Sequence, residues 1–130
     1  MLANEEHGIQ LEVHPGEKEL LVEVFLGERK QQVSVTIKAS KSAGCQLIKL
    51  LSRACVVNGH QVVRSALTTN SNLELGGLCI EMSTDPPVVD VVHNLVASDL
   101  IFQDFAQSLY SVAFYADQIE NRMMGGEDVF

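Results

Sequence analysis

The sequence predicts an α+β domain: an antiparallel β-sheet of five to six strands, with a short middle helix and a long C-terminal amphipathic helix packed on one face. Three observations predict this class. Apolar and polar residues alternate through the first forty positions, a short helical pattern follows near the middle, and apolar residues recur at spacings of three and four near the end. The 130 residues fit one domain, residues 1–130, and we expect mobile ends at residues 1–8 and 125–130.

Three strands of an antiparallel meander are predicted in the N-terminal part. Alternation with a period of two marks Ile9–Val13, Leu20–Leu26 and Val33–Ile37 as strands that each bury one face. Pro15-Gly16 supplies the first turn, and the polar run Gly27–Lys30 supplies the second. These turns are short, so the three strands should be neighbours in the sheet.

The middle of the chain predicts a short helix and a hairpin. Leu47–Val57 fits either a helix or a strand, and the pattern alone leaves both open. Asn58 can cap a short helix that ends near Asn70. Leu75–Met82 and Val88–Val96 have the pattern of two strands in a hairpin, because a turn sequence with two prolines separates them.

The C-terminal segment predicts a long helix with two apolar stripes. Ser98 or Asp99 can cap it, and Gly125-Gly126 follows its expected last residue, Met124. The stripe expected to cover the sheet consists of Ile101, Phe105, Leu109, Val112, Ala116, Ile119 and Met123. The second stripe, beside it, consists of Phe102, Ala106, Tyr110 and Phe114. Because one stripe is enough to cover a sheet, the second predicts another buried surface, and we expect a homodimer.

The net charge of −8 is unevenly distributed along the chain. Nine acids and one base follow residue 80, whereas Arg29–Leu73 holds seven bases and no acid. A negative net charge disfavours the binding of nucleic acid, although the basic stretch could still form a local basic face. We expect the basic and acidic regions to neutralise each other in part. No stretch reaches the roughly 18 apolar residues of a membrane span, and the N-terminus lacks a signal-peptide pattern. We therefore expect a cytoplasmic protein without membrane contact.

The sequence offers no recognisable catalytic or metal-binding motif. Cys45, Cys55 and Cys79 form no C-x-x-C pair, which favours buried, reduced thiols over a disulfide framework or a zinc site. The four histidines are scattered, and none lies at the i, i+4 spacing that places two imidazoles on one helix face. Gly76-Gly77 lacks the following Lys-Ser/Thr of a phosphate loop and indicates a turn or bulge at the start of a strand. We expect no enzyme activity, no catalytic residue, no metal and no cofactor.

Three short segments resemble those of a known superfamily. They are Asn70–Glu81 (NSNLELGGLCIE), Val89–Leu95 (VDVVHNL) and Ala116–Glu120 (ADQIE) in the last helix. Their order, a helix ending at Asn, a glycine before a strand, a second strand and a long helix, resembles the type III secretion chaperone-like superfamily and its YbjN-like branch. The resemblance spans roughly Val33–Met124 and implies an antiparallel sheet with helices on one face. It also implies that Leu47–Val57 is a strand.

The resemblance implies a non-enzymatic protein-binding module that sequesters an extended segment of a partner protein. Secretion chaperones are typically small, acidic homodimers, but they usually open with an amphipathic helix for which Met1–Gly8 is too short. The residues that we expect at a partner or dimer interface are Val33, Val35, Ile37, Phe102, Ala106, Tyr110 and Phe114. Two alternatives stay open: a YbjN-like regulatory or structural oligomer subunit without a client, and a small-molecule-binding domain.

Overall fold

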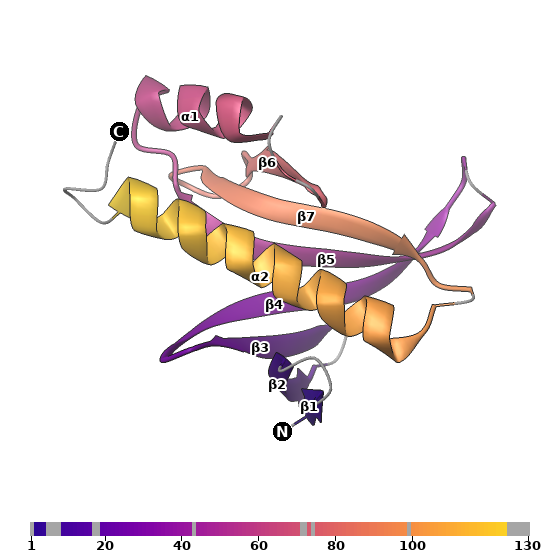
Figure 1. Cartoon of the computed structure of the whole chain (residues 1–130). Helices are drawn as coiled ribbons and strands as arrows, with labels where there is room; N and C mark the ends of the chain where they lie inside the picture. Colours follow the sequence, from indigo (N-terminus) through magenta and orange to yellow (C-terminus); the bar gives the residue numbers. More distant parts are fainter. Residues whose placement is uncertain are drawn as a thin grey trace.

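The computed structural model describes residues 2–4, 9–16, 19–42, 44–70, 73, 75–98 and 100–124. They form one antiparallel sheet and two helices, drawn in Figure 1. The elements are β1 (Leu2–Asn4), β2 (Ile9–Pro15), β3 (Leu20–Leu26), β4 (Arg29–Ser40), β5 (Cys45–Val56), α1 (His60–Asn70), β6 (Gly77–Glu81), β7 (Val88–Val96) and α2 (Phe102–Met124). The predicted α+β class is confirmed. Of the ends expected to be mobile, residues 1, 5–8 and 125–130 lie outside the described residues.

The strands follow one another in the sheet in the order β1-β2-β3-β4-β5-β7-β6. Every neighbouring pair is antiparallel, and the meander and the β6–β7 hairpin form as predicted. The three-residue β1 pairs with β2 and brings the sheet to seven strands, whereas five to six strands were predicted. Residues 2–4 of the short N-terminal segment therefore form a strand.

Leu47–Val57, which fitted both a helix and a strand, lies almost entirely in the central strand β5. β5 pairs with β4 on one side and with β7 on the other. A strand in this position has neighbours on both edges and apolar residues on both faces, so its sequence is a nearly continuous apolar run without clear alternation.

α2 begins at Phe102, later than a cap at Ser98 or Asp99 would place it, and it runs to Met124 as predicted. The carbonyl oxygen of Ile101 accepts a hydrogen bond from the amide of Phe105 at 3.1 Å, so Ile101 stands at the cap position. Its side chain is 55% exposed and does not continue the stripe that covers the sheet, which corrects that prediction.

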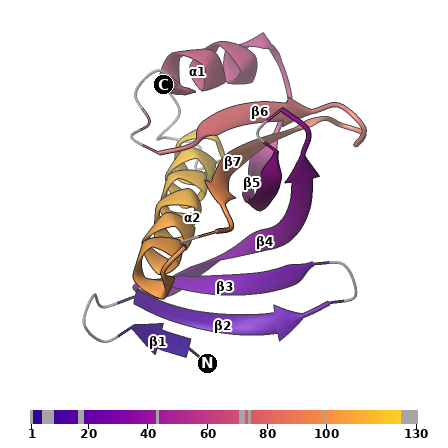
Figure 2. The ribbon, with the colours of Figure 1, turned by 90° about the vertical axis from the view of Figure 1, so that its right-hand side faces the viewer.

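The core lies between α2 and one face of the sheet. Figure 2 shows α2 crossing this face from the side of β2 to the side of β7. The helix buries the predicted residues Leu109, Val112, Ala116 and Ile119, and the sheet contributes Leu11, Val22, Val24, Val33, Val35, Leu50, Val89 and Val91. α1 packs beside β6 and adds Val62 and Ala66. Burial of this apolar surface is the main stabilising contribution to the fold.

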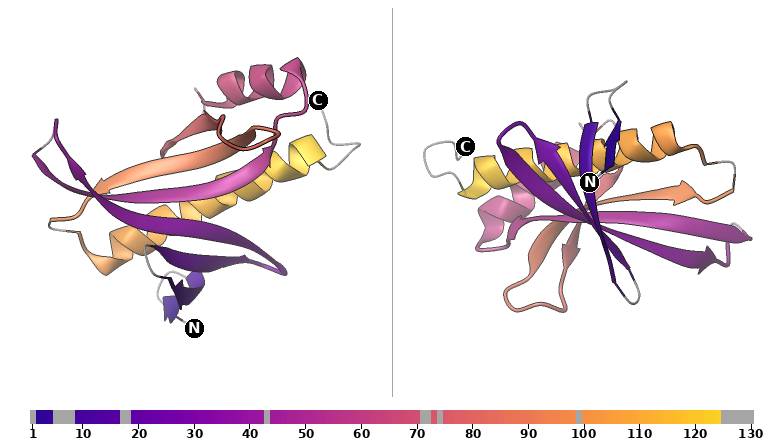
Figure 3. Two further views of the ribbon diagram at one scale, coloured as in Figure 1. Left: turned by 180° about the vertical axis from the view of Figure 1, so that it is seen from behind. Right: turned by 90° about the horizontal axis from the view of Figure 1, so that it is seen from below.

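The other face of the sheet, called the open face from here on, carries no described helix over β3, β4 and β5. In the left panel of Figure 3 these strands pass in front of α2. Residues directly opposite each other in an antiparallel pair share a face, and the register pairs the buried Val22 with Val33 and Val35 with Leu50. Their strand neighbours, such as Ser34 and Lys49, therefore point to the open face.

Candidate protein-binding surface

Three of the seven residues predicted at an interface lie in the core instead. Val33 is fully buried and Val35 is 6% exposed, because both belong to the face of β4 that α2 covers. Ala106 is also fully buried, as are Ala113 and Ala116. These small residues let the helix approach the sheet closely, and the second stripe therefore does not face outward along its whole length. A partner of the folded protein cannot reach these three predicted residues.

The other four predicted residues reach the surface. Ile37 is 65% exposed, Phe102 51%, Phe114 38% and Tyr110 36%. The rings of Tyr110 and Phe114 stack with centroids 6.0 Å apart and an interplanar angle of 18°. Phe114 also meets Tyr115 edge to face, with centroids 5.8 Å apart. An outward aromatic pair therefore stands on α2, and its place in an interface stays a prediction.

At one end of β4, the strand is paired with a neighbouring strand along only one of its two edges. The pairing of β4 with β3 ends at Val35, opposite Leu20, whereas its pairing with β5 continues to Ser40, opposite Cys45. Among the described residues, no strand lies against the outer edge of residues 36–39, and the β4–β5 hairpin projects at the right of Figure 1. Main-chain donors and acceptors at such an edge are free to pair with another extended chain.

Beside this free edge, apolar side chains gather at the start of α2. A hollow of about 300 Å³ is lined by Ile48, Leu100, Ile101, Phe102 and Phe105. Ile37, on the free end of β4, is the direct cross-strand partner of Ile48 and extends the same surface. We call these six residues the apolar patch. Sequence reasoning identified Ile37 and Phe102 but missed the others, because the patch is formed by β4, β5 and the start of α2, which come together only in the folded chain.

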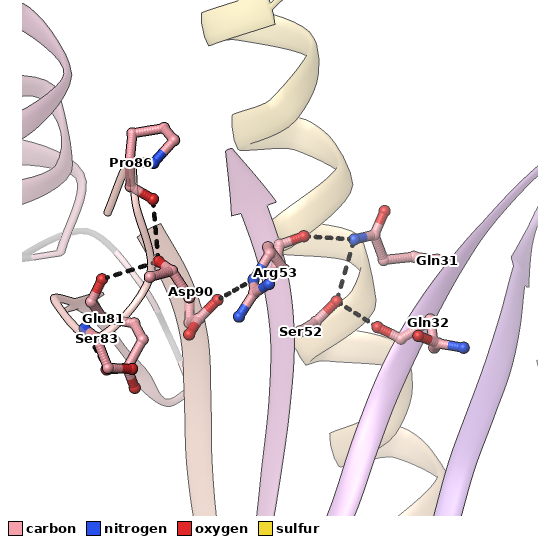
Figure 4. Close-up of polar contacts among 9 residues, drawn as sticks. Gln31, Gln32, Ser52, Arg53, Glu81, Ser83, Pro86 and Asp90 are labelled. Carbon is pink, nitrogen blue, oxygen red and sulfur yellow. Dashed lines mark hydrogen bonds and ion pairs between the residues drawn. The ribbon is translucent and has the colours of Figure 1, made fainter. Parts of the chain in front are cut away.

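Polar contacts at the inner end of the projecting hairpin join β4 to β5. The ladder between the two strands starts at Ser34 and Leu51, and side chains bridge them beyond that point. The amide of Gln31 donates to Ser52 Oγ at 3.1 Å and to the Arg53 carbonyl at 2.8 Å, while Ser52 Oγ donates to the Gln32 carbonyl at 2.7 Å (Figure 4). The buried hydroxyl of Ser52 is thus satisfied, and the two strands stay joined where the ladder ends.

The open face holds a second hollow, of about 540 Å³. It is lined by Glu19, Leu21, Gln31, Gln32, Ser34, Thr36, Lys49, Leu51 and Arg53. Beside it, Asp90 is nearly inaccessible and lies 3.5 Å from Arg53 Nε (Figure 4). Burial raises the pKa of the Asp90 carboxyl, and the guanidinium of Arg53 opposes this rise. The lining of this hollow combines hydrogen-bonding and charged groups with apolar surface, so it could hold a small molecule that carries both kinds of surface.

Ion pairs join the basic middle of the chain to its acidic end, as expected. Arg29 on β4 pairs with Asp117 on α2 at 2.7 Å, and Arg53 on β5 approaches Asp90 on β7. The two charge regions therefore neutralise each other in part within one chain.

None of the three cysteines, Cys45, Cys55 and Cys79, forms a disulfide. Cys55 is buried, whereas Cys45 is half-buried and Cys79 is exposed, so the expectation of buried thiols holds fully for Cys55 alone. Burial, with a further contribution from Glu120, raises the pKa of the Cys55 thiol to about 11. Burial also raises the pKa of Cys79, followed by the effect of Asp90. Both groups are therefore weak nucleophiles at neutral pH, because the thiolate is the reactive form.

The chain matches no protein-family model, and none of the curated proteins is significantly similar to it in sequence. Within the described ranges, neither helix combines the length and apolar character that crossing a membrane requires.

Proposed function

We propose that the protein is a non-enzymatic binding module that holds an extended segment of a partner protein along the free edge of β4. One observation carries the proposal: residues 36–39 are paired with a neighbouring strand on one side alone, and they lie next to the apolar patch. An added strand would supply the main-chain hydrogen bonds that this edge lacks. Its alternate side chains would bury part of the patch.

The exposed apolar surface is large enough to contribute to affinity. Ile37, Ile101 and Phe102 are each more than half exposed. Covering them would remove on the order of 250 Å² of apolar surface from water, or about 6 kcal/mol before the entropic cost of association. Each main-chain hydrogen bond of an added strand contributes about 1 kcal/mol net. These contributions support moderate binding of a short segment without any chemical step.

The proposal includes a homodimer in which the Tyr110–Phe114 pair lies at or beside the contact between two copies. The pair is separate from the apolar patch along α2, so one copy could bind a partner segment while its aromatic pair contacts the second copy. The proposal also places the protein in the cytoplasm, where the three cysteines, none of which forms a disulfide, would stay reduced.

The alternative is an oligomer subunit without a client. In that case the apolar patch of one copy would be covered by another copy of the same chain, and short segments of other proteins would not compete. The second hollow, on the open face of the sheet, supports the other alternative, a small-molecule-binding domain. Peptide binding distinguishes the leading proposal from both.

A library of displayed twelve-residue peptides tests the proposed function. The purified protein is used for selection, and enriched peptides are then measured against two variants. Ile37→Lys places a charge on the free edge, whereas Leu67→Lys places the same charge on α1 at a side chain that is 67% exposed, close to the 65% of Ile37. Both changes lie at the surface, so both variants should fold.

We expect the enriched peptides to carry apolar residues at every second position, because an added strand turns alternate side chains to one face. Their affinity should fall at least tenfold for Ile37→Lys and stay unchanged for Leu67→Lys. Peptides that bind Ile37→Lys as well as the unchanged protein, or that carry apolar residues at helical spacing, would contradict the proposal. Failure to enrich any peptide would also contradict it.

A further inference from the structure

Two carboxylates and one imidazole converge on the open face of β2 and β3, outside the binding surface described above. Glu12 and His14 are two residues apart on β2 and therefore share a face, and the register places Glu23 of β3 directly opposite Glu12. His14 Nε2 lies 2.8 Å from Glu23 Oε1 and 3.3 Å from Glu12 Oε1. One ligand atom from each residue lies within 4.8 Å of the others.

This spacing is close to that of a metal centre. Zinc binds imidazole nitrogen and carboxylate oxygen at 2.0–2.2 Å, which puts the ligand atoms of a tetrahedral site about 3.4 Å apart. The His14–Glu12 distance already agrees, and the His14–Glu23 distance needs to widen by roughly half an ångström. The three side chains stand on adjacent paired strands, so the backbone fixes their relative positions without any metal.

Lys30 of β4 orients the third carboxylate. Its Nζ lies 2.8 Å from Glu23 Oε2, which leaves Oε1 turned toward His14. An outer group that fixes the orientation of a ligating carboxylate is a regular feature of metal sites.

We propose that Glu12, His14 and Glu23 bind one divalent transition-metal ion, of which Zn²⁺ is the representative. Imidazole with carboxylate oxygen suits Zn²⁺ better than Ca²⁺ or Mg²⁺, which prefer oxygen alone. Three protein ligands leave a fourth position for water or for a group of a bound molecule. All three side chains reach solvent, with exposed fractions of 46% for His14, 39% for Glu12 and 19% for Glu23, so the ion can enter and leave.

The expectation of a metal-free protein rested on the absence of two histidines at helical spacing. The pattern that indicates this site is different: Glu-x-His along a predicted strand, with a second Glu on the strand that follows. The sequence shows both parts, but only the register between β2 and β3 places Glu23 beside them.

Titration of the purified, metal-free protein with Zn²⁺ tests the proposal, with binding followed by calorimetry. We expect one ion per chain. Binding should be lost in His14→Gln and weakened at least tenfold in Glu12→Gln, and it should be unchanged in His60→Gln, since His60 is an exposed histidine at the start of α1. Circular dichroism establishes that each variant is folded. Because His14→Gln and Glu12→Gln both change exposed side chains, the test can still be carried out if one of the two variants does not fold.

Substitution with Co²⁺ identifies the ligands independently of affinity. Nitrogen and oxygen ligands give weak visible bands, whereas a cysteine thiolate gives an intense near-ultraviolet charge-transfer band. We expect the weak bands alone. Absence of Zn²⁺ binding, binding that survives His14→Gln, or a thiolate band would each overturn the proposal.

Discussion

Phe114→Glu should convert the proposed dimer to folded monomers. Phe114 is 38% exposed and stacks on Tyr110. Since a phenylalanine side chain presents on the order of 200 Å², about 75 Å² faces outward, and covering it contributes about 2 kcal/mol at ~25 cal/mol per Å². A two-fold symmetric dimer contains the contact twice, so its loss removes about 4 kcal/mol and weakens association several hundredfold.

The same substitution should leave the protomer folded. The carboxylate can reach water because position 114 is partly exposed, and the loss of the aromatic stack costs each protomer about 1 kcal/mol, or a few degrees in melting temperature. Light scattering at micromolar concentration measures the mass, and circular dichroism measures the fold. We expect twice the chain mass of 14.2 kDa for the unchanged protein and the single mass for the folded variant. A single mass for the unchanged protein refutes the dimer, whereas an unfolded variant places Phe114 in the core.

Two further predictions concern stability. Burial raises the pKa of the Asp90 carboxyl, so the folded state binds the carboxyl proton more tightly than the unfolded state does. Ionisation of Asp90 therefore lowers the unfolding free energy as the pH rises from about 4 through the raised pKa of the folded state. Asp90→Asn should therefore lose less unfolding free energy between pH 4 and pH 7 than the unchanged protein in urea denaturation; an equal loss would contradict this. Gly76 has φ +75°, and a Cβ there would collide with the Val92 carbonyl oxygen, whereas Gly27 has φ +69° and open space around it. Gly27→Ala should cost about 1 kcal/mol and Gly76→Ala at least about 2 kcal/mol more, and equal costs would show that the collision is relieved.

The strands with one solvent face were predictable from sequence, whereas the central strand was not. β2, β3 and β4 alternate because one face packs under α2 and the other is open, so the period of two appears directly in the sequence. β5 carries leucines on both faces, because Leu50 is buried in the core whereas Leu51 lines the hollow on the open face, and this run of leucines fits a helix equally well. The hydropathy pattern left both a helix and a strand open for Leu47–Val57, and only the resemblance to secretion chaperones implied a strand.

The candidate sites depended on information that local patterns do not contain. Ala106 was counted with the outward stripe because an alanine has the hydropathy of either face, and only the close approach of α2 to the sheet buries it. The free edge of β4 exists because β4 is longer than β3 beyond Val35, which requires the register of the pair. Glu12 and Glu23 likewise become neighbours only through the β2–β3 register. Sequence reasoning therefore predicted the layers of the fold and part of the apolar binding surface, but it did not predict the cluster of Glu12, His14 and Glu23.

Amide hydrogen exchange on the protein with and without a selected peptide tests the central claim most directly. In the free protein, the amides of residues 36–39 that point away from β5 should exchange quickly, because the described structure gives them no strand partner. Binding of the peptide should slow their exchange at least tenfold and leave the amides of β6, the strand at the opposite edge of the sheet, unchanged. Protection of β6 or of the open face in place of residues 36–39, or binding that protects no amide in β4, would contradict the account.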